Sequence, residues 1–137
     1  MQPMIRFLKD VYLAGFAIVF RLSRAKDIAY KAGSATGALT VIDWFIMIGI
    51  FGYIEMSLDK QFMFSKPLVI IAFFALFFLN GYVLFVRGHG VKFAREFDHM
   101  EKSRRIVLVV SCTVIAVAAV VFFICSGIAY RRFTGVH

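Results

Sequence analysis

Three long runs of apolar residues divide the chain, and charged segments separate them. Residues 67–86 form a run of twenty without a charge, and residues 106–130 form a run of twenty-five. A third run extends from residue 32 to residue 54 and contains one charge, Asp43. A helix rises about 1.5 Å per residue, so each run is long enough to cross a bilayer core of about 30 Å. The pattern predicts transmembrane helices at about 32–56, 67–86 and 106–130.

The N-terminal segment, residues 1–31, has a different pattern. Its uncharged part is too short to span a bilayer, but residues 4–22 hold many large apolar side chains between charged ends. Such a pattern is typical of an amphipathic helix that lies in the membrane interface. A cytoplasmic helix packed under the bundle is the alternative. The predicted fold is an all-α membrane protein in which residues 1–31 form an interfacial or cytoplasmic segment and residues 32–137 form a three-span domain.

The connector, residues 87–105, reads RGHGVKFAREFDHMEKSRR and joins the second and third runs. Six Lys and Arg precede the first run, two lie between the first and second, six lie in the connector and two follow the third. Short loops rich in Lys and Arg stay on the cytoplasmic side. This bias predicts a cytoplasmic N-terminus and an external C-terminus. The connector residues that we assign to topology and to contact with anionic headgroups are Arg87, Lys92, Arg95, Lys102, Arg104 and Arg105.

Local patterns within the connector indicate a helix stop and a new short helix. Gly88 predicts that the preceding helix ends at the start of the connector. Residues 91–103 predict an amphipathic helix, because Phe93, Phe97 and Met100 recur at i, i+4 and i+7. This helix either lies on lipid, which we favour, or docks a partner.

The composition agrees with a membrane protein. Hydrophobic residues make up 61% of the 137 residues, with 17 Phe, which is more apolar surface than a soluble domain of this size can bury. The net charge of +8 comes from residues that flank the apolar runs, so topology and anionic lipid explain it better than nucleic acid. Cys112 and Cys125 are thirteen positions apart in one predicted helix, which is too far for a disulfide.

Polar residues inside the predicted spans are the strongest candidates for a site. If the first span begins at residue 32, Asp43 lies near its middle, where a carboxylate is costly unless it is protonated, paired or hydrated. If the span begins nearer Leu39, Asp43 lies in the cytoplasmic interface beside Trp44. Asn80 lies seven residues from the cytoplasmic end of the second span, and Ser111 lies six residues from that of the third. At these depths the three side chains can meet as one polar cluster. The cluster is either a proton or ion site or, as we favour, a set of interhelical hydrogen bonds.

Two further pairs of residues have spacings that suggest a site. Glu55 and Asp59 are one helical turn apart at the outer end of the first span; they form either an outward acidic patch for a basic partner or, as we favour, a solvated helix end. Glu96 and His99 match a metal-binding Glu-x-x-His spacing, but a bundle metal site needs a second such motif. No nucleophile with a base is evident. We therefore predict no catalytic, cofactor-binding or metal residues.

The overall pattern, three spans in a short chain with a basic inner loop and KFAREFDHMEKSRR running into the last apolar helix, resembles small bacterial inner-membrane immunity proteins. These accompany pore-forming bacteriocins or secreted polymorphic toxins. The resemblance covers architecture and includes no residue-level motif, so it assigns no functional residue. It implies a non-enzymatic protein that binds the membrane-inserted part of a toxin and blocks it.

Two other functions remain open at this point. The first is a self-assembling channel or holin-like pore, in which Asp43 and Asn80 would line the interior of a homo-oligomer. The second is an accessory subunit of a larger membrane complex. In that case the docking face would be the small residues of the first span, which permit close helix approach: Gly33, Gly37, Gly49 and Gly52.

Overall fold

The computed structural model describes residues 2–24, 26–59 and 66–135, and all of their regular structure is helical. The predicted all-α class is confirmed. The turn predicted between the first two spans falls largely on residues 60–65, outside the described residues. The elements in chain order are α1 (Gln2–Leu22), α2 (Ile28–Leu58), α3 (Lys66–Gly81), the π-helix η1 (Tyr82–Val86), α4 (His89–His99) and α5 (Lys102–Thr134).

Three of these helical segments are long and apolar enough to cross a membrane. They are Ile28–Leu58, Pro67–Val86 and Lys102–Thr134, and they contain the three predicted spans. The chain is therefore built as a multi-pass membrane protein. Helices α2 and α5 have 31 and 33 residues, which is longer than the roughly 20 residues that a bilayer core requires.

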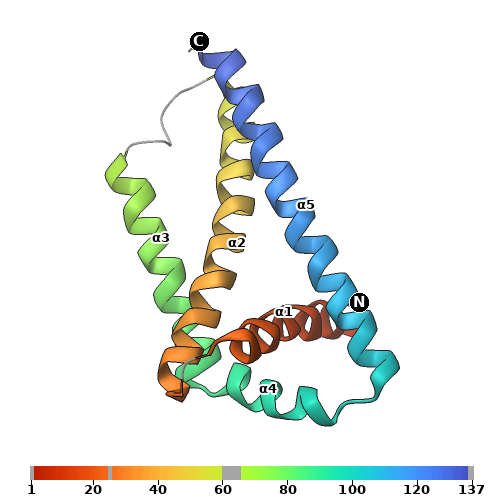
Figure 1. Cartoon of the computed structure of the whole chain (residues 1–137). Coiled ribbons are helices and arrows are strands. Elements are labelled where there is room, and N and C mark those ends of the chain that lie inside the picture. The colour runs from red at the N-terminus through yellow and green to blue at the C-terminus, as the bar shows by residue number, and fades with distance from the viewer. Residues whose placement is uncertain (1, 25, 60–65, 136–137) are drawn as a thin grey trace.

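The three membrane-spanning segments diverge from one another, and α1 and α4 lie together at one end of the molecule (Figure 1). Helix α2 is central. Helix α5 contacts α2 near the C-terminus of the chain and leans away toward the opposite end, whereas α3 diverges from α2 in the other direction (Figure 1). Helix α1 runs crosswise between α2 and α5, with α4 beside it. The N-terminal helix and the connector thus share one end of the molecule.

The middle of α1 is enclosed by protein. Val11 and the five consecutive residues from Leu13 to Ala17 are buried, and α1 packs against α2, α4 and α5. Because burial extends around the whole helix and not along one stripe, this part is a core helix. The alternative of a helix packed under the bundle therefore describes residues 11–17 better than an interfacial helix does. Met4 and Leu8, nearer the N-terminus, are exposed.

The amphipathic helix predicted in the connector is present as α4, but its apolar face is covered by protein. Gly88 adopts a left-handed conformation with φ +70° and begins α4, which agrees with the predicted helix stop. Phe93, Ala94 and Phe97 are buried in the same cluster as Phe16 of α1. The favoured prediction that this face lies on lipid is therefore wrong, because α1 occupies it.

Two ion pairs hold α1 in place. Arg21, in the last turn of α1, pairs with Asp98 of α4 at 3.0 Å. Asp10 of α1 pairs with Arg104, in the first turns of α5, at 2.8 Å. These pairs are partly exposed, so each contributes on the order of 1 kcal/mol or less. Their main effect is to position α1, because one pair joins it to the end of α4 and the other joins it to the beginning of α5.

Candidate functional site

A hydrogen-bonded cluster around Asp43, the Asp43 cluster, joins the three helices α1, α2 and α3. The Asp43 Oδ2 atom accepts a hydrogen bond of 2.8 Å from the Tyr12 hydroxyl of α1 and one of 2.9 Å from the Asn80 side-chain amide of α3. The same Asn80 amide donates to the Thr40 hydroxyl at 3.2 Å. The Thr40 hydroxyl in turn donates to the backbone carbonyl of Thr36 at 2.8 Å. Together, the four side chains form one connected network.

The local sequence explains why these groups share a position. Thr36, Thr40 and Asp43 are spaced i, i+4 and i+7, so they lie on one face of α2. Asn80 lies in the last turn of α3, just before the π-helix η1. Thr40 is fully buried, while Asp43 and Asn80 are half-buried. The carboxylate therefore has two donors from two other helices, as a polar group in a membrane bundle requires.

Tyr12 is held as a hydrogen-bond donor. Burial is the main cause that raises the pKa of the Tyr12 hydroxyl well above its ordinary value of 10.0, and the neighbouring Asp43 carboxylate raises it further. The hydroxyl therefore keeps its proton at any physiological pH. A tyrosine that cannot release its proton positions the carboxylate and does not act as a base.

The structure brings together two of the three predicted intramembrane residues. Asp43 and Asn80 are in direct contact, whereas no hydrogen bond joins Ser111 to either of them within the described chain. Ser111 is half-buried on α5. The third helix that contributes a side chain to the cluster is α1, through Tyr12, and not α5 through Ser111. Sequence reasoning missed Tyr12, because residues 4–22 were assigned to the membrane interface.

An apolar cavity borders the Asp43 cluster. It has a volume of about 180 Å³ and lies between α1, α2 and α5. Asp43 and Tyr12 are in its wall, and the rest of its lining is almost entirely apolar. On the α5 side Cys112 approaches α1 closely: a Cβ atom on Gly15 would lie 3.0 Å from its sulfur. The lining residues that are neither Asp43 nor Tyr12 are Leu8, Val11, Leu39, Ile42, Ile46, Cys112, Ile115 and Ala116.

The second carboxylate of α2, Glu55, lies near the C-terminal end of that helix and is completely buried. Its side chain is hydrogen-bonded with Tyr130 of α5. The predictions of an outward acidic patch and of a solvated helix end are both wrong for Glu55, because α5 covers it. Asp59 is exposed and adopts a left-handed conformation with φ 49°. Its backbone N–H caps the end of α2.

Close approach of α2 and α5 produces this burial. A Cβ atom on Gly49 would overlap the ring of Phe122, and one on Gly52 would lie 2.9 Å from the Ser126 hydroxyl oxygen. The Ser126 hydroxyl donates to the Gly49 carbonyl at 3.1 Å. By contrast, a Cβ atom on Gly33 would meet nothing within 4 Å. Gly49 and Gly52, and not Gly33, are therefore the positions of close packing.

The basic residues of the connector lie in or beside α4 and at the start of α5. Arg87 stacks over the ring of Tyr82, 5.7 Å from its centroid, and Lys92 lies 3.9 Å from Glu96. Arg105 is half-buried, and the other five are exposed. Among the described residues, no group of three His, Cys, Asp or Glu side chains is arranged to hold a metal ion. The described positions of these residues fit a charged surface at one end of the spans: Arg87, Lys92, Arg95, Lys102, Arg104 and Arg105.

Comparisons with known proteins found no family model, no curated protein and no solved structure that matches this chain.

Proposed function

We propose that this chain is a non-enzymatic protein of the bacterial inner membrane that binds the membrane-inserted helix of a toxin and so protects the cell. The N-terminus and the connector are cytoplasmic in this proposal, and the C-terminus is external. The excess of Lys and Arg before the first span and in the connector supports that orientation. Helices α1 and α4 lie at the same end of the molecule (Figure 1), as the orientation requires.

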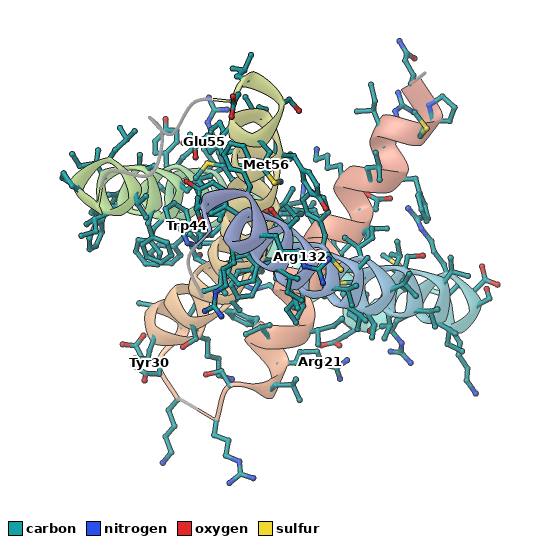
Figure 2. The ribbon with its side chains drawn as sticks, turned by 90° about the horizontal axis from the view of Figure 1, so that it is seen from above. Arg21, Tyr30, Trp44, Glu55, Met56 and Arg132 are labelled. Atoms are coloured by element: carbon teal, nitrogen blue, oxygen red, sulfur yellow. The ribbon has the colours of Figure 1, made fainter. Side chains whose placement is uncertain are left out.

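The observation that carries the proposal is an apolar groove between the diverging helices α2 and α3. The groove has a volume of about 220 Å³. Figure 2 shows Trp44 on the side of α2 that faces α3, where its ring meets Phe73 edge-on at 5.4 Å between centroids. Van der Waals packing drives helix association in lipid, and large aromatic residues are typical anchors of interfaces. The groove is lined by Trp44, Met47, Ile48, Phe51, Leu68, Val69 and Ala72.

The groove differs from the other apolar surface of the molecule. Exposed apolar side chains on α3 and α5 need no protein partner, because lipid tails solvate them. A concave groove offers more contact to a bulky side chain than a convex helix surface does. A neighbouring membrane helix that inserts such side chains between α2 and α3 therefore gains packing that lipid chains provide less well.

A channel is less well supported. A pore built from several copies would need Asp43 and Asn80 on its interior surface, but within this chain they bind each other, and Asp43 also accepts from Tyr12. For an accessory subunit, the close-approach positions Gly49 and Gly52 are already occupied by α5. An accessory subunit would therefore have to dock through the remaining small residues, Gly33 and Gly37, and a pore would need another lining.

The proposal is tested first by measuring membrane potential with a voltage-sensitive dye in bacteria that express the intact protein. We expect no depolarisation, and depolarisation by the protein alone would replace the proposal by the pore. The second step is survival of the same cells against a panel of pore-forming bacteriocins, with protection expected against one cognate toxin. Protection against none of a broad panel would count against the toxin partner.

A pair of variants locates the binding surface. Ala72→Trp fills the groove between α2 and α3, whereas Ala118→Trp places the same side chain on an exposed position of α5. We expect Ala72→Trp to abolish protection at an unchanged membrane level and Ala118→Trp to retain it. Equal protection by both variants would exclude the groove as the binding surface.

A further inference from the structure

A second groove lies where α1 and α4 meet the beginning of α5, and it combines two arginines with an apolar floor. Its volume is about 650 Å³. Arg21 of α1 and Arg105 of α5 are its only charged lining residues. The remaining lining residues come from the same three helices and are all apolar: Ile18, Leu22, Phe97, Ile106, Val109 and Val110.

We propose that this groove binds an anionic phospholipid, with the headgroup phosphate at the arginines and an acyl chain along the apolar residues of α5. Arg105 is in the first turns of α5, at the edge of the apolar run, and Ile106, Val109 and Val110 continue from it into the span. Along α5 the positive charge of Arg105 is therefore followed by apolar side chains. A phospholipid has the same order, a phosphate followed by an acyl chain. The proposal does not depend on the toxin partner.

The charges of the groove favour an anion. Within the described residues Arg105 takes part in no ion pair. Arg21 is bound to Asp98 at 3.0 Å, but its side chain remains 51% exposed, and a guanidinium has five N–H donors, more than one carboxylate uses. The two arginines and Asp98 leave one net positive charge beside the groove. The dipole at the N-terminus of α5 adds to this positive potential.

The apolar part of the groove is open for an occupant. Leu22 is 75% exposed, Ile106 is 52% exposed and Val110 is 54% exposed. Phe97, which is buried, forms the base of the groove. Exposed apolar side chains directly beside arginine at the end of a membrane span are suited to the boundary between acyl chain and headgroup.

A neighbouring groove shows why this one is selected. On the other side of α1, a groove of about 400 Å³ is lined by Arg6, Asp10 and Arg104 together with apolar residues. There the carboxylate of Asp10, which binds Arg104 at 2.8 Å, is itself part of the lining, so a phosphate would meet a like charge inside the groove. In the groove beside Arg105 the corresponding carboxylate, Asp98, binds Arg21 from outside the lining.

The test is native mass spectrometry of the intact protein released from detergent micelles that contain equal amounts of phosphatidylglycerol and phosphatidylcholine with identical chains. We expect phosphatidylglycerol to be bound preferentially. Arg21→Gln combined with Arg105→Gln should reduce that preference by about 25-fold, which is about fivefold for each arginine near the membrane surface. The control is Arg131→Gln combined with Arg132→Gln, which removes the same charge from the exposed far end of α5 and should keep the preference.

Three outcomes would overturn the proposal. One is equal binding of both lipids by the unchanged protein, which needs no variant to observe. Another is a loss of preference in the Arg131/Arg132 control that equals the loss in the groove variant. The third is competition by soluble glycerol phosphate as effective as that by phosphatidylglycerol, because it would indicate a simple anion site. Circular dichroism verifies that the variants are helical, and Arg21→Lys with Arg105→Lys, which keeps both charges, should retain most of the preference.

Discussion

The two carboxylates of α2 differ in a way that their sequence positions do not reveal. Asp43, in the middle of the first span, is half-buried and accepts hydrogen bonds from α1 and α3. Glu55, at the edge of the same span, is completely buried against Tyr130 of α5. The residue at the middle of α2 is thus the less enclosed of the two. Exposure is set by the helix face and by how closely the neighbouring helix approaches that face.

The two sites are also built by different means. The Asp43 cluster is assembled from polar partners on three helices, and α1 supplies one of them. The Glu55 site depends on two helices that touch backbone to side chain at Gly49 and Gly52. One site should therefore be sensitive to the loss of hydrogen-bonding groups, and the other should be sensitive to added volume.

The largest expected effect comes from adding volume between α2 and α5. In Gly49→Leu, the new side chain overlaps the ring of Phe122, so we expect the free energy of unfolding to fall by about 3 kcal/mol, at the upper end of typical overpacking costs. Separation of the helices should also expose Glu55 to a water-soluble carbodiimide, with modification measured by mass spectrometry. Detergent-induced unfolding followed by circular dichroism measures the loss of stability.

Two further variants decide whether steric overlap is the cause. Gly33→Leu makes the same change on the same helix where a Cβ atom meets nothing within 4 Å, and it should cost less than about 1 kcal/mol. Adding Phe122→Ala to Gly49→Leu should restore much of the lost stability. If Gly33→Leu were as harmful as Gly49→Leu, overlap with Phe122 would not be the cause, and helix propensity could not account for the loss either, since leucine is a better helix former than glycine.

A smaller effect is expected when the hydrogen-bond acceptor of the Asp43 cluster is removed. Asp43→Leu leaves the Tyr12 hydroxyl and the Asn80 amide without their shared acceptor, and it should lower the free energy of unfolding by about 2 kcal/mol. Asp43→Asn keeps an oxygen that can accept, so its cost should stay below about 1 kcal/mol. The same unfolding titration measures both. Equal harm from the two substitutions would mean that the negative charge, and not the acceptor, is required.

Ser111→Ala is the matched control for the Asp43 variants. Ser111 was predicted at the same depth, but the structure gives it no hydrogen bond to the cluster, so its loss should cost less than about 0.5 kcal/mol. A cost as large as that of Asp43→Leu would contradict the observed arrangement. The comparison separates depth in the membrane from actual contact.

The sequence was sufficient to predict the spans and one contact of the Asp43 cluster, that between Asp43 and Asn80. Long uncharged runs bounded by basic residues define the depth of each residue, and depth alone predicted that Asp43 and Asn80 could meet. Depth does not define the helix face, which is why Ser111 was placed wrongly. The same limit applies to Glu55, whose distance from the end of the run predicted solvent although its face meets α5.

The packing of the short helices could not be predicted from their amphipathic pattern. An apolar stripe, such as Phe93 and Phe97 on α4, has the same appearance whether lipid or protein covers it. In this chain α1 covers the apolar face of α4. That pairing also carries Tyr12 to Asp43, a contact across 31 positions for which the local sequence has no signal.

Within the Asp43 cluster, the smallest loss at neutral pH is expected from removing the Tyr12 hydroxyl. Tyr12→Phe keeps the ring and removes one hydrogen bond to Asp43, so it should lower the free energy of unfolding by about 1 kcal/mol or less.

In the folded protein the pKa of Tyr12 is raised above 10.0, whereas in the unfolded chain it is close to 10. The protonated hydroxyl therefore stabilises the fold fully below about pH 10. Above that pH the unfolded chain alone releases the proton, and stability falls by up to about 1.4 kcal/mol per pH unit. Unfolding titrations between pH 8 and 11 should show a steeper alkaline loss in the unchanged protein than in Tyr12→Phe, with the other tyrosines contributing equally to both. Parallel curves would mean that Tyr12 is not buried beside a carboxylate. The Asp43 cluster would then lack its partner from α1, which is the feature that distinguishes it from the Glu55 site.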